Sequence, residues 1–257
     1  MDGVTNVGNA PGTIDGWYAL HMLYRVDWAR LRALDARARE GALTDAEARL
    51  ESFAQAEATH AGSSGFYWLF GHKGDLMAIH LRPSLDALST LETEFAKAPI
   101  GDCLTPSYSY LSVVELSTHG GGGKAPEAQE AMQEALRARL EPSLPRTRYV
   151  CFYPMSKLRG EQRNWYMLTP AERQELMRSH GLIGREYAGK VKQIITGSMG
   201  LDDWEWGVDL FADDPLQFKK IVYEMRFDEV SALYALFGAF YVGMRLEAGD
   251  LRRYLAI

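Results

Sequence analysis

The residues with the clearest chemical potential lie in the second half of the chain. Tyr153 opens the run Tyr153-Pro154-Met155-Ser156-Lys157, His180 follows, and Gln193 interrupts an apolar stretch. A phenol can carry a radical, an imidazole can bind iron, and an amide can donate a hydrogen bond to a ligand. These three side chains together would suffice for a haem-type site.

The run that begins at Tyr153 has the pattern of a strand. Side chains alternate between the two faces of a strand, so Tyr153, Met155 and Lys157 are expected on one face. A phenol, a thioether and an ammonium would then share one wall. The same pattern is also typical of an amphipathic edge strand that ends near a proline.

His180 and Gln193 each allow two interpretations. His180 directly precedes Gly181, which predicts that a helix ends there, and a histidine in a last turn can interact with the helix dipole without any other role. It can equally be held there as an iron ligand. Gln193 is expected to be buried in its strand, where the sheet satisfies its amide or a ligand does.

The remaining histidines and the cysteines do not form metal motifs. The two cysteines, Cys103 and Cys151, are far apart, which fits a reducing cytosol. No paired spacing occurs among the other histidines, which we assign to packing or to the surface: His21, His60, His72, His80 and His119.

Composition excludes several classes of protein. The chain has 257 residues, 47% hydrophobic and 24% charged, with a formal net charge of -6. This acidic balance argues against nucleic acid as a partner. The N-terminus has no signal-peptide pattern, and the longest apolar stretch, residues 232–244, is too short to span a membrane. We expect a cytoplasmic protein with no membrane partner.

The chain reads as two similar halves. The first has strand patterns at 17–25, 65–70, 75–81 and 107–116. A capping box at Thr44 and Glu47 indicates the start of one helix, and Ser84 indicates the start of another. The second has strand patterns at 148–156, 189–196, 204–211 and 233–245, with helices beginning at Thr169 and spanning 215–226. The cap at Thr169 follows the one at Thr44 by 125 residues, which suggests an internal duplication.

The repeated unit predicts an α+β fold. Each ferredoxin-like βαββαβ unit makes an antiparallel sheet with both helices on one face, so two open faces can pack together as a barrel-like body. The remaining sheet edges could serve contacts between subunits. The predicted boundaries are a flexible N-terminus (1–16), a first repeat (17–116), a glycine-rich linker with a helix (117–145) and a second repeat (146–257).

Gly120 to Gly123 lie in that linker, but no Lys-Ser/Thr pair follows, so a solvated loop is favoured over a phosphate site.

Several segments together carry a family resemblance. The chain resembles the coproheme decarboxylases of the chlorite dismutase-like superfamily over nearly its whole length, most densely from Arg139 to Leu246. The segments that carry the resemblance are residues 153–157, 164–168, 179–185, 189–198, 204–207 and 223–231.

The resemblance implies a fold, a substrate and partners. The fold is a dimeric α+β barrel, usually assembled as a homopentamer. The substrate is iron coproporphyrin III (coproheme), at once cofactor and reactant, and hydrogen peroxide is the oxidant. Two propionates lose CO2 and become the vinyl groups of haem b, the product. The sequence leaves open whether a ferrochelatase makes transient contact and hands over the ligand.

The resemblance also assigns roles by position. His180 matches the proximal iron ligand, Gln193 the distal residue and Tyr153 the catalytic tyrosine. Lys157 could in addition donate a proton. The matching porphyrin-binding residues are Arg139, Ser231 and Lys157, with Tyr153, Pro154, Met155 and Ser156 completing one wall and Arg226 as a further cation.

Two other functions remain open. Chlorite dismutases carry a distal arginine thirteen residues after the proximal histidine, and Gln193 occupies that position after His180. A neutral amide stabilises an oxychlorine anion less well than a guanidinium, which argues against efficient chlorite dismutation and leaves weak peroxidase activity. A non-catalytic haem carrier or sensor would need His180 but not Tyr153.

Overall fold

The computed structural model describes residues 12–117 and 126–256. The predictions of a flexible segment at residues 1–11 and of a solvated loop at Gly120 to Gly123 lie outside the described residues. Residues 13–16, predicted to be part of a flexible terminus, instead begin the first strand. The described part confirms an α+β fold built from two βαββαβ units.

The first unit follows the predicted order of strands and helices. Its long helix α2 does not begin at Thr44: Asp35 caps it by accepting a hydrogen bond from the Ala38 N–H, and the Thr44 hydroxyl donates to the Glu40 carbonyl within the helix. The elements, with short 3-10 turns at Gln55–Glu57 and Pro99–Cys103, are β1 (Thr13–Val26), α1 (Trp28–Ala33), α2 (Ala36–Ala54), β2 (Ser63–Leu69), β3 (Leu76–Arg82), α3 (Leu85–Ala96) and β4 (Leu104–Ser117).

The second unit has the predicted capping box, because Thr169 and Glu172 each accept a hydrogen bond from the other's backbone N–H. After the connecting helix α4 (Pro126–Leu140), its elements are β5 (Tyr149–Lys157), a 3-10 turn (Trp165–Met167), α5 (Pro170–Glu186), β6 (Lys192–Gly197), β7 (Trp206–Ala212), α6 (Leu216–Met225), α7 (Glu229–Tyr234), β8 (Ala235–Phe237), β9 (Tyr241–Leu246) and α8 (Asp250–Leu255).

The predicted strand at 233–245 is divided into β8 and β9. Both pair with β5, at Met155–Lys157 and at Tyr149–Phe152 respectively. The break lies opposite Pro154, whose carbonyl accepts the Gly238 N–H at 2.8 Å. Because proline has no N–H to donate, the paired ladder cannot run unbroken past it.

The strands of the described residues close into one barrel. Their order is β7-β6-β4-β1-β3-β2-β9-β5-β8, and β5 also pairs with β7, which completes the ring. Two pairings, β4 with β6 and β2 with β9, join the halves. These edges are therefore paired within the chain, and the use of the remaining edges between subunits stays a prediction.

The barrel interior is filled by side chains from both units. Tyr67, Tyr110, Phe152 and Phe211 are among its fully buried members. His21, fully buried as well, stacks on Phe152 with ring centroids 4.1 Å apart. Its assignment to packing is therefore confirmed.

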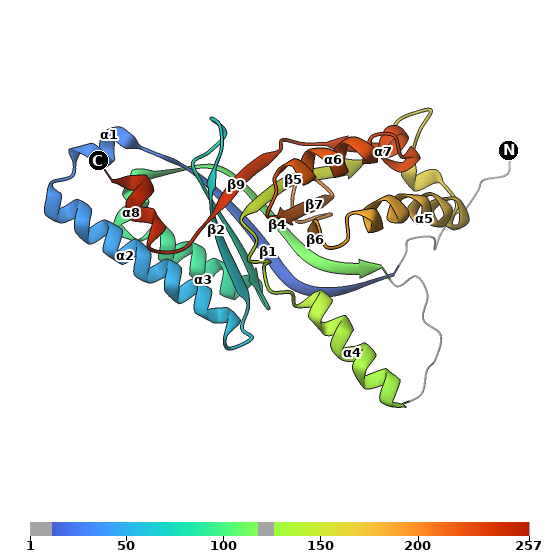
Figure 1. The fold of residues 1–257 in the computed structure, drawn as a ribbon, viewed down its shortest axis with the longest axis horizontal. Helices are drawn as coiled ribbons and strands as arrows, with labels where there is room; N and C mark the ends of the chain where they lie inside the picture. Colours follow the sequence, from blue (N-terminus) through green and yellow to red (C-terminus); the bar gives the residue numbers. More distant parts are fainter. Residues whose placement is uncertain (1–11, 118–125, 257) are drawn as a thin grey trace.

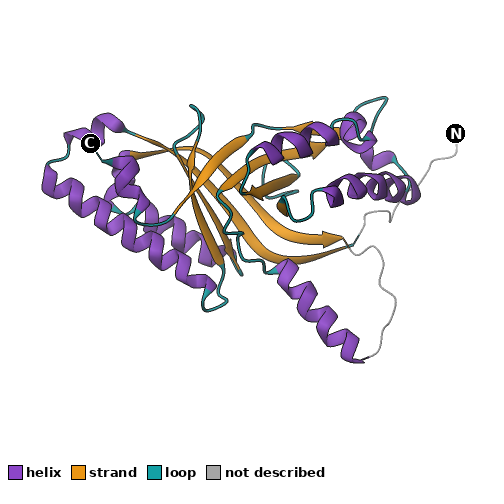
Figure 2. Cartoon of the chain, in the orientation of Figure 1, coloured by secondary structure: helices purple, strands orange, loops and turns teal. Residues whose placement is uncertain are grey.

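The helices cover the outer face of the barrel on two opposite sides, and only one side is solidly packed. Figure 1 shows α1, α2, α3 and α8 together on one side and α5, α6 and α7 on the other, with the sheet between them. The same separation is visible in Figure 2, where α4 projects away from the strands.

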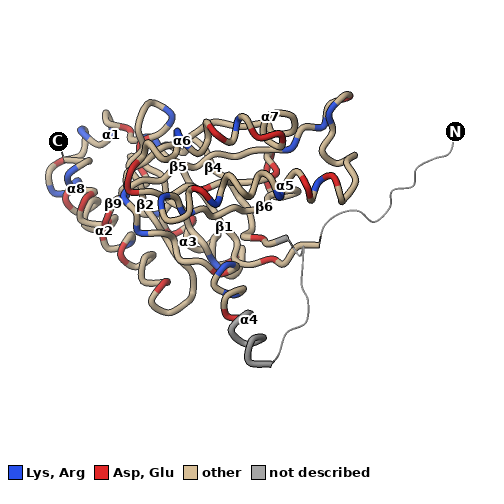
Figure 3. The backbone as a smooth tube through the Cα atoms, turned by 45° about the vertical axis from the view of Figure 1, so that its right-hand side comes forward, with Lys and Arg blue, Asp and Glu red and all other residues tan. Residues whose placement is uncertain are grey.

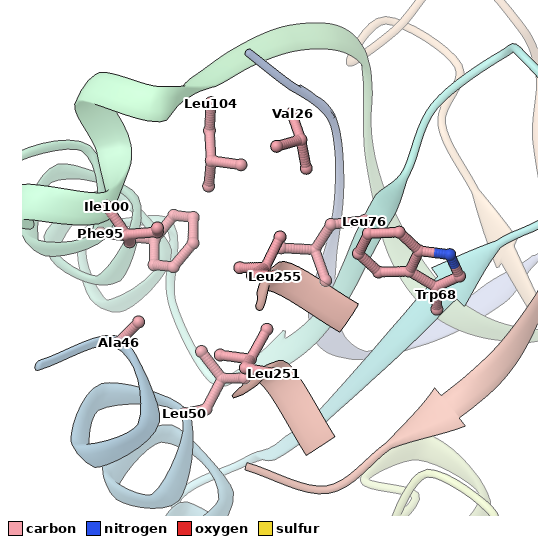
Figure 4. Close-up of a pocket in the computed structure, with 10 residues that line it drawn as sticks. All are labelled: Val26, Ala46, Leu50, Trp68, Leu76, Phe95, Ile100, Leu104, Leu251 and Leu255. Carbon is pink, nitrogen blue, oxygen red and sulfur yellow. The ribbon is translucent and has the colours of Figure 1, made fainter. Parts of the chain in front are cut away.

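The C-terminal helix α8 fills the space between α2, α3 and the sheet of the first unit. Leu251 and Leu255 are each 2% exposed and lie among apolar side chains that include Leu50 and Phe95 (Figure 4). The void that remains there measures about 10 Å³. This volume is close to the least that can hold one water molecule.

Candidate functional site

The second unit contains a large cavity where the first unit is filled. It measures about 1900 Å³ and lies between α5 and strands β5, β6 and β7. None of the residues of α5 is buried, since one face of this helix looks into the cavity and not onto a packed core. Most of the predicted site residues line the cavity: Arg139, Tyr153, Met155, Lys157, His180, Gln193 and Ser231.

His180 lies inside α5 and not at its end. The helix continues through Gly181 to Glu186, and the left-handed residue follows later at Gly189, with φ of 81°. The His180 side chain is 29% exposed, and its Nδ1 lies 2.6 Å from the Oδ2 of Asp228. Its Nε2 has no hydrogen-bond partner among the described residues and is available for a metal ion.

Asp228 orients this imidazole and was not anticipated from the sequence. It caps α7, and its Oδ2 also accepts the Ser231 N–H at 3.2 Å. A carboxylate on the second ring nitrogen fixes the tautomer and raises the basicity of a ligating histidine. The Asp-Glu pair before a short apolar run signals a helix start, but nothing in the sequence indicates a contact with a residue 48 positions earlier.

Tyr153 stands on the cavity wall as strand alternation predicted. Its ring stacks on Phe240 with centroids 4.5 Å apart and contacts Phe237 at 5.9 Å. Only 8% of the residue is exposed. Burial raises the pKa of the phenol far above its ordinary value, against a small opposing effect of Arg226, so the hydroxyl is protonated at neutral pH.

Lys157 extends from the end of the same strand. Its Nζ lies 4.5 Å from the centre of the Trp165 ring, within the range of a cation–π contact. Burial lowers the pKa of the ammonium to about 8, although the nearby carboxylates of Asp228 and Glu205 favour its charged form. An amine with this pKa can give or take a proton near neutral pH.

Gln193 differs from its prediction. The side chain is exposed and not buried, because the face of β6 that carries Gln193 and Ile195 is turned to the open cavity. Its partner in β7 is Leu210. The amide therefore faces the cavity and is free to contact a ligand there.

Three predicted residues do not line the cavity. Pro154 and Ser156 point to the other side of β5, where the Ser156 hydroxyl accepts the Glu205 N–H at 3.3 Å. Arg226 is exposed, and its guanidinium lies 3.6 Å from the centre of the Phe237 ring. Alternation along the strand predicts the first two placements, whereas the third depends on the tertiary fold.

Further polar residues line the cavity without having been predicted. Glu205 and Trp165 belong to segments that carried the resemblance, but no role was assigned to them. Arg173, Arg185 and Lys192 add positive charge. Acidic and basic residues occur together along α5 (Figure 3), as in the ion pair between Glu175 and Arg178.

The described residues hold neither a metal-binding cluster nor a membrane-spanning helix. No group of three or more histidine, cysteine or acidic side chains there could hold a metal ion by itself. No helix within 12–117 and 126–256 is long and apolar enough to cross a membrane. Both cysteines are buried and free.

Comparison with known proteins identifies the class. The family model for chlorite dismutase matches residues 39–246, and the chain belongs to this family. A solved heme-binding protein from Thermus thermophilus is 45% identical, with 98% of this chain and 99% of that chain covered and a TM-score of 0.89.

More distant structures share the fold. A mutant of chlorite dismutase from Candidatus Nitrospira defluvii is 19% identical, with 95% of this chain and 96% of that chain covered and a TM-score of 0.75. The same enzyme in complex with imidazole is 18% identical, with a TM-score of 0.72 and coverage of 95% and 96%.

Proposed function

We propose that this protein is a coproheme decarboxylase, which uses hydrogen peroxide to convert two propionates of Fe-coproporphyrin III to the vinyl groups of haem b. One observation carries the proposal: Tyr153 and Lys157 extend from one strand into the cavity that His180 enters from the opposite helix. Family membership and the 45% identity to a heme-binding protein support a haem-type ligand.

The residues present fit an iron porphyrin. His180 offers its Nε2 while Asp228 holds its Nδ1, the arrangement that a ligating histidine requires. The exposed surface of the cavity is mainly apolar, which suits the face of a macrocycle. When bound, the iron porphyrin would supply the oxidising equivalents that it takes from peroxide.

The balanced reaction sets what the protein must provide. For each propionate, RCH2CH2COO⁻ + H2O2 + H⁺ gives RCH=CH2 + CO2 + 2 H2O. The side chain loses two electrons and one proton, peroxide takes up two electrons and two protons, and one proton is therefore consumed overall. The protein must therefore offer a group that takes a hydrogen atom from the propionate and a group that delivers a proton.

Tyr153 and Lys157 suit these two tasks. A phenol that is neutral at working pH can lose its hydrogen atom and become a phenoxyl radical. This radical can then recover a hydrogen atom from the propionate carbon. Because the pKa of Lys157 is about 8, its ammonium can both pair with a carboxylate and release a proton.

The remaining carboxylates of the substrate need further partners. We assign them to Arg139 and Ser231, which line the cavity, with Arg226 as a partner reached by reorientation from Phe237. Gln193, which lines the cavity, would offer its amide to the peroxide. The pentamer, the transfer from a ferrochelatase and a cytoplasmic location stay predictions.

Mass spectrometry of the porphyrin tests the proposal directly. Stepwise addition of peroxide to the complex with Fe-coproporphyrin III should give two successive losses, each of CO2 and two hydrogens. Tyr153→Phe should bind the substrate and abolish both losses, whereas Tyr18→Phe, which removes another phenol at the cavity wall, should not.

The alternative functions make different predictions. A carrier or sensor would give no mass loss in any variant. A chlorite dismutase would release oxygen from chlorite, which an oxygen electrode measures. The neutral Gln193 makes this reaction unfavourable. Unchanged turnover of Tyr153→Phe would exclude the assigned hydrogen-atom acceptor.

A further inference from the structure

Glu205 is tied to the end of β5 by a set of hydrogen bonds. The residue is 7% exposed, and it lines the cavity. Its Oε2 accepts the backbone N–H of Lys157 at 2.6 Å. Its own N–H donates to the Met155 carbonyl at 3.1 Å and lies 3.3 Å from the Ser156 hydroxyl. One acidic residue thus holds three consecutive positions of the strand.

The carboxylate takes the place of a missing strand. Pairing between β5 and β7 ends at Met155 and Trp206, so β7 offers no carbonyl to the Lys157 N–H. The Glu205 side chain accepts that N–H instead, while Lys157 pairs with Ala235 of β8 on the other side. The backbone from which the Lys157 side chain leaves is therefore fixed from both sides.

The same carboxylate contributes negative charge beside the ammonium of Lys157. Glu205 and Asp228 are the two acidic groups that act on Lys157, and Trp165 covers it with its ring. Asp228 is already bound to the His180 imidazole.

Glu205 has two further neighbours of its own. The hydroxyl of Tyr166 is hydrogen bonded to it, and an Arg159 nitrogen lies 3.9 Å from its Oε1. Arg159 is 68% exposed, so solvent screens it and leaves most of the negative charge of Glu205 to act on Lys157.

We infer that Glu205 is a positioning residue for Lys157: it fixes the strand end that carries the lysine and keeps the ammonium protonated at neutral pH. This inference rests on the proposed function for its catalytic meaning, since the reaction consumes one proton for each propionate. Its effect on Lys157 itself can be measured without any substrate.

The sign of the effect follows from the burial of Lys157. Desolvation has already lowered the pKa of this amine to about 8. Removal of the Glu205 charge removes a stabilising neighbour of the ammonium, so the pKa falls further. A large fraction of Lys157 would then be neutral at pH 7.5 and unable to deliver a proton.

Glu205→Gln separates charge from geometry. The amide oxygen can still accept the Lys157 N–H, whereas the negative charge is lost. Glu115→Gln is the matched control, because Glu115 is another carboxylate on the cavity wall, bonded to the Trp206 Nε1 at 3.2 Å, and it does not act on Lys157.

The measurement is the pH dependence of Lys157 acetylation by acetic anhydride, read by peptide mass spectrometry on the protein without porphyrin. The midpoint should lie near pH 8 in the unmodified chain and in Glu115→Gln. It should fall by about one pH unit in Glu205→Gln, the lower end of the effect of a nearby opposite charge. An equal midpoint in all three proteins would overturn the inference.

A second variant guards against a folding defect. Glu205→Asp keeps the charge on a shorter side chain, so it should return the midpoint most of the way to pH 8. Thermal unfolding of each variant shows whether the fold is intact. If both Glu205 variants shifted the midpoint equally, the charge would not be the cause and the inference would fail.

Turnover with Fe-coproporphyrin III links the shift to catalysis. The alkaline limb of the Lys157-dependent CO2 loss should move to lower pH in Glu205→Gln by the same amount as the acetylation midpoint. Lys157→Arg, whose guanidinium does not release its proton, should lose most of this CO2 loss at every pH. A shifted midpoint without any decarboxylation by the unmodified protein would refute the proposed function and leave the action of Glu205 on Lys157 intact.

Discussion

Asp228→Asn should weaken the binding of Fe-coproporphyrin III while the protein stays folded. The Asp228 side chain is 1% exposed, and its Oδ2 faces the His180 Nδ1 at 2.6 Å. Asparagine preserves the hydrogen bond to the imidazole and the cap on the Ser231 N–H, but it removes the negative charge. A less basic imidazole binds ferric iron more weakly.

The size of the effect can be worked out from these contacts. Mutation of the residue that holds a ligating histidine typically lowers metal affinity by about 10 to 100 times, which is about 1.4 to 2.7 kcal/mol. Stability should fall as well, because the buried Oδ1 of Asp228 has no hydrogen-bond partner among the described residues. An amide NH2 at that place would be an unpaired donor, at a cost of about 1–3 kcal/mol.

Absorbance titration of the protein with ferric coproporphyrin measures the affinity, and urea denaturation measures the stability. Asp214→Asn is the control, because Asp214 also accepts a backbone N–H at a helix start, that of Leu216 at 3.0 Å, but does not line the cavity. Its affinity for the porphyrin should not change. If Asp228→Asn folded and bound as tightly as Asp214→Asn, then Asp228 would not act on the ligand through His180.

Three further outcomes follow from packing and charge. Lys157→Met should raise the free energy of unfolding at pH 7, measured by urea titration, by on the order of 1–2 kcal/mol, because it removes a buried charge. In the unmodified chain, the free energy of unfolding should rise from pH 8 towards pH 10.5, because folded Lys157 loses its proton there while the unfolded lysine keeps it. Leu255→Ala should lower the free energy of unfolding by about 2–5 kcal/mol and leave the porphyrin affinity unchanged; a loss of affinity would contradict the placement of α8 away from the cavity. Gly197→Ala places a Cβ 2.4 Å from the Glu115 carboxyl, which must swing away and lose its hydrogen bond from the Trp206 Nε1. Calorimetry should therefore show about 0.5–1.5 kcal/mol of destabilisation, and the fluorescence of Trp206 should change; an unchanged melting temperature and spectrum would contradict this close contact.

Local patterns predicted the repeated order of elements well. The capping box at Thr169 and the alternation along β5 depend only on neighbouring residues, and the structure confirms both. The same capping pattern at Thr44 was misleading, because a threonine within a helix can donate to the carbonyl four residues earlier. Gly181 was likewise misread, since glycine is tolerated inside a helix when later residues continue it.

Contacts between distant elements could not be predicted in this way. The pairing of His180 with Asp228 and the contact of Glu205 with Lys157 depend on how helices and strands meet in space. The exposure of Gln193 had the same origin: its strand pattern implied burial, but the helix that would cover it stands off across a cavity. The family resemblance predicted most of the residues that line the cavity. It did not predict that Asp228 contacts His180 or that Glu205 contacts Lys157.

The position of α8 has a consequence for biosynthesis. Leu251 and Leu255 are synthesised long after the first unit, yet they complete its interior, and β9 pairs with β2 of that unit. The first unit therefore emerges with apolar surface that stays uncovered until α8 has been synthesised. A ribosome stalled before residue 250 would hold a nascent chain with exposed apolar surface that is prone to aggregate. Rapid translation through α8 shortens the time for which this surface is exposed.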